Sequence, residues 1–245
     1  VYVWDMDETL ILLKSLLDGT YAAPFSGLKD KKRGIEIGKQ WENLILKVCD
    51  EYFFYEEIED YNEPLLDALS EYDDGRDLSK YNFNNDGFDD LNKRKLAYRH
   101  RSIKEKYSQG LHKILDQQTI KLWTDLYNLT DSYSDGWLSS AHDLLKQSIN
   151  VLVTSGSLIP SLAKCLLYRL DDVIVYSSWE VGKLRCFSWI KERYPNVKFC
   201  AIGDGKEECE AAQAMRWPFI KMDLRPYRFP GLTMKVVQSF IDVAY

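Results

Sequence analysis

Short apolar runs alternate with amphipathic segments through the C-terminal part of this chain. The apolar runs predict strands at 150–154, 173–176, 198–203 and 219–222. The segments between and after them have the period of helices, at 160–170, 180–194, 207–215 and 232–243. Because parallel strands need a crossover connection, usually a helix, this alternation predicts a parallel sheet with helices on both faces. The apolar run at 1–5 has the same character and is assigned to the same sheet.

The 144 residues between Thr9 and Thr154 follow a different pattern. Helical periodicity marks 37–52, 91–115, 118–129 and 136–148, and no strand is predicted there. We therefore expect an α/β fold in which residues 1–25 and 148–245 form a Rossmann-like core and residues 26–147 form an inserted α-helical subdomain. The insertion contains an acidic stretch at 50–90 and a basic stretch at 93–106. Solvated surface is the simpler interpretation of both, and an anion-recruiting face stays open for the basic one.

The composition removes some classes of function. A net charge of -6 argues against direct binding of nucleic acid by the chain as a whole, and no apolar run approaches the roughly 18 residues that cross a membrane. Five scattered cysteines form no C-x-x-C pair, so we expect reduced thiols in an intracellular protein, nuclear or cytoplasmic. Because the first predicted strand begins at residue 1, we also expect the chain to be part of a longer protein.

Two carboxylates directly follow the first predicted strand. Asp5 and Asp7 lie in the sequence Asp-x-Asp-x-Thr, which ends at Thr9. In open α/β sheets the carboxyl ends of the strands are where ligands bind, so this position favours chemistry. The alternative is an ordinary acidic cap at a strand-to-helix turn. The two carboxylates share a side only if the chain stays extended, and a turn there would separate them.

Other strand ends supply complementary groups. Thr154 and Ser155 follow the second strand, where a hydroxyl and backbone N–H groups before a helix suit an anionic oxygen. Lys183 opens the next helix and could reach the same edge as a point charge for phosphate. Asp204 follows a later strand between two glycines, with Glu208 one helical turn on. Hard oxygen ligands beside a phosphate describe a magnesium site.

This ordered set of motifs resembles the haloacid-dehalogenase-like hydrolases over the whole chain. The fold implied is a three-layer Rossmann-like parallel sheet core with an inserted α-helical cap. Only 28 residues separate Thr154 from Lys183, so a large second cap has no room. Within that superfamily the chain resembles the conserved domain of the eyes absent family, and the segments that carry this likeness are 3–9, 15–22, 77–81, 85–88, 158–160 and 202–205.

The resemblance implies a magnesium-dependent protein tyrosine phosphatase that uses aspartate as its nucleophile. Asp5 would attack phosphorus and form an aspartyl-phosphate intermediate. Asp7 would act as acid and base, with its backbone carbonyl on the metal. Asp204 would bind Mg²⁺ directly, whereas Glu208 would act through a water or as an orienting group, and Thr9 would support the site.

Thr154, the backbone N–H of Ser155 and Lys183 would hold the phosphate oxygens, and the implied substrate is a phosphotyrosine protein or peptide. The family also serves as transcriptional co-regulators, so a homeodomain transcription factor of the sine oculis type is an expected partner. Two alternatives stay open: a docking module with marginal activity, and a small-molecule phosphatase. Lys14 stands where we expect His in animal members, and the Thr154 motif is less rich in Thr, which leaves substrate preference open.

Two other kinds of site fit the sequence poorly. A cysteine-based phosphatase requires Cys-x5-Arg, whereas the nearest candidate, Cys165 with Arg169, has only three intervening residues. The three histidines all fall in the helical insertion without a nearby cysteine ligand, so we do not expect zinc there: His100, His112 and His142.

Overall fold

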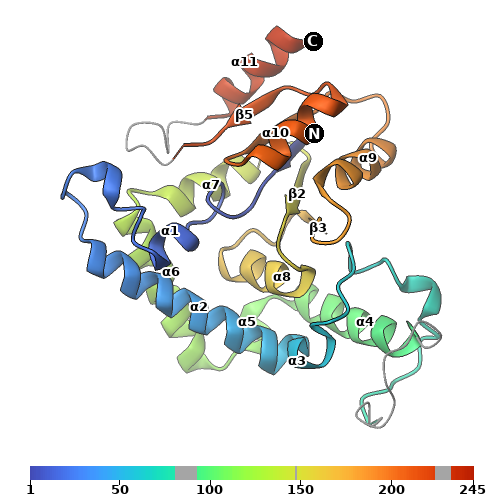
Figure 1. Ribbon diagram of the computed structural model, residues 1–245. Helices are drawn as coiled ribbons and strands as arrows, with labels where there is room; N and C mark the ends of the chain where they lie inside the picture. The colour runs from blue at the N-terminus through green and yellow to red at the C-terminus, as the bar shows by residue number, and fades with distance from the viewer. Residues whose placement is uncertain (81–92, 147, 224–232) are drawn as a thin grey trace.

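Five parallel strands form the centre of the molecule. The computed structural model describes residues 1–80, 93–146, 148–223 and 233–245, and its sheet has the order β3-β2-β1-β4-β5 (Figure 1). The strands are β1 (Tyr2–Trp4), β2 (Asn150–Thr154), β3 (Ile174–Ser177), β4 (Cys200–Gly203) and β5 (Phe219–Lys221). The prediction of an α/β fold with an all-parallel sheet is confirmed.

Alternating residues of the strands pack against helices on the two faces of the sheet. Val3 of β1 belongs to a buried apolar cluster with Val151 and Val153 of β2 and with residues of α9 (Lys183–Arg193) and α10 (Lys206–Met215). Trp4 and its neighbours Leu152 and Ile202 belong to a second cluster, with α8 (Leu158–Leu167) and α11 (Met234–Ala244). The layers therefore follow from the two-residue period of the strands.

Residues 10–149 contain helices and turns, and no strand is present in the part of this segment that the structure describes. They form α1 (Lys14–Leu17), α2 (Lys31–Phe53), α3 (Tyr55–Ile58), α4 (Lys93–Gln109), α5 (Leu111–Ile114), α6 (Gln117–Tyr133) and α7 (Trp137–Leu145), with 3-10 turns at Ala23–Phe25 and Ser70–Tyr72. The longest helix, α2, packs against α6 and α8, so the insertion shares the apolar cluster on the α8 side of the sheet (Figure 1).

Most predicted helices differ from the observed ones by a few residues at their ends, and two differences have a clear local cause. The helix expected at 37–52 begins at Lys31, because the side chain of Asp30 caps it by accepting bonds from the backbone N–H of Lys32 and Arg33. The single helix expected over 91–115 is broken into α4 and α5 at Gly110. Gly110 has a φ of +75°, a conformation that glycine adopts without the steric cost other residues incur.

The strand register brings the ends of the central strands to one edge. Trp4 lies opposite Leu152 and Ile202, and Thr154 lies opposite Ser177, so the residues that follow these strands share that edge. The family-like segment at 85–88 lies outside the described residues, as does the end of the segment at 77–81. None of the helices that the structure describes is long and apolar enough to cross a bilayer.

Candidate phosphoryl-transfer site

The chain turns immediately after β1 and sends its two acids in different directions. The backbone carbonyl of Met6 accepts hydrogen bonds from the N–H groups of Leu10 and Ile11, at 2.9 and 3.1 Å. The extended conformation therefore ends between Asp5 and Asp7, and their side chains have different partners: Lys183 of α9 for Asp5 and Lys164 of α8 for Asp7. The two carboxylates thus pair with lysines of two different helices.

Glu8 shapes this turn, a role that the sequence did not suggest. Its φ is +59°, a left-handed conformation uncommon for a residue with a side chain. Its Oε1 accepts hydrogen bonds from the backbone N–H groups of Leu13 and Ser15, both at 3.1 Å. The half-buried Glu8 carboxylate thus ties the loop to the start of α1, and these hydrogen bonds hold the backbone next to Asp7 in its uncommon conformation.

Asp5 lies in a buried ion pair with Lys183. The Lys183 Nζ lies 2.5 Å from Asp5 Oδ1 and 2.6 Å from Glu208 Oε2, and all three residues are less than 8% exposed. The hydroxyl of Thr9 donates to the other Asp5 oxygen at 3.4 Å. Glu208 also accepts a bond from the backbone N–H of Gly205, which sets its orientation at the start of α10.

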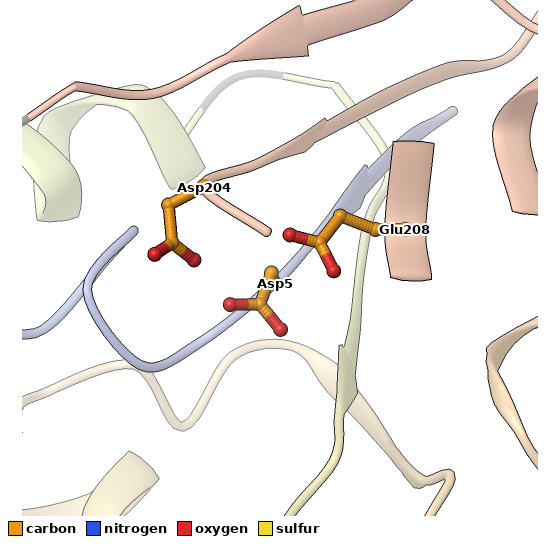
Figure 2. Close-up of side chains that lie close together, drawn as sticks. All are labelled: Asp5, Asp204 and Glu208. Carbon is orange, nitrogen blue, oxygen red and sulfur yellow. The ribbon is translucent and has the colours of Figure 1, made fainter. Parts of the chain in front are cut away.

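A third acid completes a carboxylate cluster at the same edge. Oxygens of Asp5, Asp204 and Glu208 all lie within 4.8 Å of one another, and Figure 2 shows them converging from the ends of β1 and β4 and from α10. Burial raises the pKa of Asp5 to about 7, and the charges of Glu208 and Asp204 add to this effect against the opposing effect of Lys183. Burial, and then the charge of Glu208, also raises the pKa of Asp204.

This donor set fits a metal ion. When ionised, the three acids outnumber the one lysine that pairs with them, so the pocket carries excess negative charge. Burial is the main cause of the raised pKa of Asp5, and a bound cation would oppose it. A hard cation with oxygen ligands would supply the missing positive charge. The buried acidic cluster can therefore bind a metal. The Asp7 side chain lies outside this set of three oxygens.

The loop after β2 is braced from two sides. Thr154 is 1% exposed, and its Oγ1 accepts the N–H of Gly156 at 3.1 Å. Its carbonyl accepts bonds from both the backbone N–H and the hydroxyl of Ser178, at 2.8 and 2.9 Å. Ser177 donates its hydroxyl to the carbonyl of Gly156 at 2.8 Å. The neighbouring loop after β3 therefore fixes the backbone on which Thr154 and Ser155 are carried.

A residue of the insertion also reaches this loop. Asn62 accepts the backbone N–H of Leu158 at 2.8 Å and donates to the hydroxyl of Ser177 at 3.2 Å. One side chain from residues 10–149 thus links the first turn of α8 to the end of β3. No sequence feature singled out Asn62, because its partners lie 96 and 115 residues away.

Lys164 is a further charged residue at the site that the sequence interpretation missed. Its Nζ lies 2.8 Å from Asp7 Oδ1 and 3.0 Å from Asp7 Oδ2. A signal was present, because Lys164 is the one charged residue in the otherwise apolar or small-residue segment Leu158–Leu167. Of the residues predicted for the site, Asp5, Lys183, Asp204 and Glu208 therefore meet in one cluster, and Asp7 lies beside it with a separate partner.

Comparison with known proteins finds extensive similarity to protein phosphatases. A protein of Arabidopsis thaliana described as protein phosphatase EYA is 56% identical, over 100% of this chain and 90% of its own length. Human protein phosphatase EYA2 is 34% identical, over 89% of this chain and 46% of its own length. Drosophila melanogaster protein phosphatase eya is 33% identical, over 89% of this chain and 33% of its own length. The chain thus spans less than half of these two animal proteins. No family model matches.

Proposed function

This chain belongs to the eyes absent (EYA) family and is a protein phosphatase, and from this premise we propose that it hydrolyses phosphotyrosine through a phosphorylated Asp5, with the help of Mg²⁺. One observation carries the proposal. Asp5 is a buried carboxylate at the sheet edge, held between a lysine and two further acids. A carboxylate so placed can act as a nucleophile if positive charge is present to screen it from phosphate.

In the first step an Asp5 oxygen would attack phosphorus while the bond from phosphorus to the tyrosine oxygen breaks. Asp7 would donate a proton to that leaving oxygen. In the second step Asp7 would take a proton from a water that attacks the phosphorus, and the bond between phosphorus and Asp5 would break. Inorganic phosphate leaves, and both aspartates return to their starting states. General acid and base assistance of this kind is typically worth about 100- to 10,000-fold.

The residues that would hold Mg²⁺ are Asp5, Asp204 and the backbone carbonyl of Asp7. Glu208 lies in the same cluster, but its Oε2 bonds to Lys183, which supports an orienting role. When bound, the cation would neutralise the charge of the acids and of the phosphate oxygens. Lys183, already between two carboxylates, would then be free to bond a phosphate oxygen as a fixed point charge.

Thr154 and Ser155 would hold the remaining phosphate oxygens. The hydroxyl of Thr154 and the N–H of Ser155 lie on a loop that bonds from Ser177 and Ser178 make rigid. Donors that are fixed before the reaction stabilise developing charge without the cost of reorganisation. This bracing supports their assignment as phosphate ligands.

The surface beside these residues supports an aromatic substrate group. A cavity of about 510 Å³ is lined by Ser155, Lys183, Leu184 and the side chain of Trp179, which is 65% exposed. An indole next to the phosphate ligands offers a flat apolar face to the ring of phosphotyrosine. Residues 26–147 would act as the cap of the site, as the bonds of Asn62 to Leu158 and Ser177 support. Binding of a homeodomain protein and a nuclear or cytoplasmic location stay predictions.

The test compares phosphotyrosine and phosphoserine versions of one peptide, each with Mg²⁺ and with chelator. The wild-type protein should release phosphate from the phosphotyrosine peptide with Mg²⁺ only. Asp5→Asn should abolish release, whereas Asp125→Asn, at an exposed position of α6, should leave it unchanged. Substantial metal-dependent release by Asp5→Asn would refute the nucleophile, and equal release from both peptides would refute the specificity.

A further inference from the structure

The strongest feature that the proposed reaction does not use is the ion pair between Lys164 and Asp7. Both oxygens of the Asp7 carboxylate contact one ammonium group, at 2.8 and 3.0 Å, across 157 residues of sequence. The Lys164 side chain is 15% exposed and that of Asp7 is 35% exposed. Lys164 is therefore the more buried partner of the pair, and Asp7 the more exposed one.

The surroundings of Lys164 leave it little freedom. Its helix, α8, carries mostly buried apolar residues, and its neighbours Cys165 and Tyr168 are buried. The helix begins at Leu158, shortly after β2 ends at Thr154, so the backbone of Lys164 follows the loop that carries the proposed phosphate ligands. Among the residues that the structure describes, Asp7 is the one acid paired with Lys164.

We propose that Lys164 is a positioning residue for Asp7, an inference that rests on the acid and base role proposed above for that aspartate. The Asp7 carboxylate can rotate about two side-chain bonds, so without a partner it would adopt several orientations. Contact of both oxygens with a fixed ammonium selects one orientation. Orientation of this kind lowers the barrier because the reacting groups need not be aligned again at every turnover.

The geometry leaves Asp7 free to react while it stays held. A carboxylate has about four lone-pair positions, and Lys164 occupies one on each oxygen. A remaining lone pair can carry or accept a proton while the carboxylate keeps a contact with the ammonium. Lys164 contacts none of the three oxygens in the carboxylate cluster, so its effect should pass through Asp7 alone.

A double-mutant cycle tests this coupling. The four proteins are wild type, Lys164→Met, Asp7→Asn and the double variant, assayed on 4-nitrophenyl phosphate and on an alkyl phosphate with Mg²⁺. An activated phenolate leaves without a proton, whereas an alkoxide needs one. Lys164→Met should therefore lower kcat/KM, which reports the step in which the alcohol or phenol leaves, about 10- to 100-fold for the alkyl ester and less than about threefold for the nitrophenyl ester. The later hydrolysis of phosphorylated Asp5 also uses Asp7 and is common to both esters, so kcat does not separate them.

In the Asp7→Asn protein, adding Lys164→Met should change neither rate by more than about twofold, because a positioning residue has nothing left to position. Lys164→Arg should restore the alkyl-ester rate to within about fivefold, since a guanidinium can also contact both oxygens. Lys121→Met, at an exposed position of α6, is the matched control and should match wild type. Calorimetric titration with Mg²⁺ should give the same affinity for wild type and Lys164→Met.

Several results would overturn the inference. If Lys164→Met lowers the rate equally for both esters, both in the wild-type and in the Asp7→Asn background, and also lowers the urea midpoint, Lys164 acts only by stabilising the fold. A rise in KM that persists in the Asp7→Asn background would make it a substrate ligand. If Lys164→Met proves unfolded, Lys164→Gln and Lys164→Arg carry the same comparison. If Asp7→Asn hydrolyses both esters at the wild-type rate, the proposed acid and base role of Asp7 is wrong. If Asp7→Asn slows the alkyl ester more than the nitrophenyl ester but Lys164→Met slows both equally, only the inference about Lys164 is wrong.

Discussion

Replacing Asp5 with asparagine should stabilise the metal-free protein at the same time as it abolishes turnover. Asp5 is 7% exposed and lies in the cluster with Asp204 and Glu208. Burial, with the charges of these two acids, raises its pKa to about 7 although Lys183 opposes the change. In the absence of metal, an ionised Asp5 therefore destabilises the folded state relative to a neutral one.

The sign and the size follow from proton binding. The folded protein keeps a proton on Asp5 up to about pH 7, whereas the unfolded chain releases it near 3.8. The free energy of unfolding therefore falls as the pH rises from about 4 to 7. The loss from Asp5 is up to about 4 kcal/mol, because each unit of pKa difference contributes about 1.4 kcal/mol. Asparagine cannot ionise, but its hydrogen bond to Lys183 is weaker, so we expect a net gain of about 2 kcal/mol at pH 8.

Urea unfolding in chelator, followed by circular dichroism at pH 8 and pH 5, measures this gain. Asp5→Asn should unfold at a higher urea midpoint than wild type at pH 8, and the difference should shrink at pH 5. Added Mg²⁺ should then stabilise wild type more than the variant, because the variant has lost one anionic ligand. A variant less stable than wild type at pH 8, or an equal difference at both pH values, would refute the reasoning. Asp125→Asn serves as the control for the substitution itself.

Three further changes test other parts of the structure. Burial lowers the pKa of His100 to about 4, so the free energy of unfolding should fall by up to about 3 kcal/mol as the pH falls from 6.5 to 4, where only the unfolded chain binds the proton. In urea titrations His100→Gln should remove this pH dependence, and an unchanged dependence of the unfolding free energy on pH would contradict the prediction. Asn62→Ala leaves the N–H of Leu158 without its acceptor and should lower the unfolding free energy by about 1–2 kcal/mol and turnover by about tenfold. Wild-type kinetics in this variant would show that the bond from Leu158 to Asn62 is not needed for activity. Asp30→Ala removes the cap of α2 and should lower the free energy of unfolding in urea by about 1 kcal/mol with unchanged kinetics. A loss of activity would show that the start of α2 affects the site.

The sheet could be predicted because its strands are continuous apolar runs. Strand β2 occupies the predicted residues 150–154, and its five residues are all buried. Positions set by distant contacts could not be predicted. Asn62 binds partners far along the chain, and the break at Gly110 depends on a backbone angle that periodicity does not record. Hydrophobic pattern reports burial, whereas these two features depend on hydrogen bonds and on backbone conformation.

The candidate site shows the same division. Motif order along the chain predicted Asp5, Lys183 and Asp204 because each directly follows a strand or opens a helix on one edge of the sheet. Lys164 lies in the second turn of its helix, away from that edge in sequence. A lone charge within an apolar helix was the available signal, and its partner could be identified only once the turn at Met6 had placed the Asp7 side chain.

The turn after β1 is what allows two neighbouring acids to act differently. Asp5 continues the strand and lies among buried acids on the α9 and α10 side, where its pKa is raised. Asp7 lies within the turn that the Met6 carbonyl closes, and its side chain pairs with Lys164 of α8. Two carboxylates in separate environments can take separate roles, because environment decides which of them attacks and which transfers protons. Had the chain stayed extended, both would have shared one side and competed for the same cation. The proposed reaction requires one nucleophile and one proton-transfer group. The backbone turn at Met6, which hydrogen bonds to Glu8 hold in place, therefore lets Asp5 and Asp7 take these two roles.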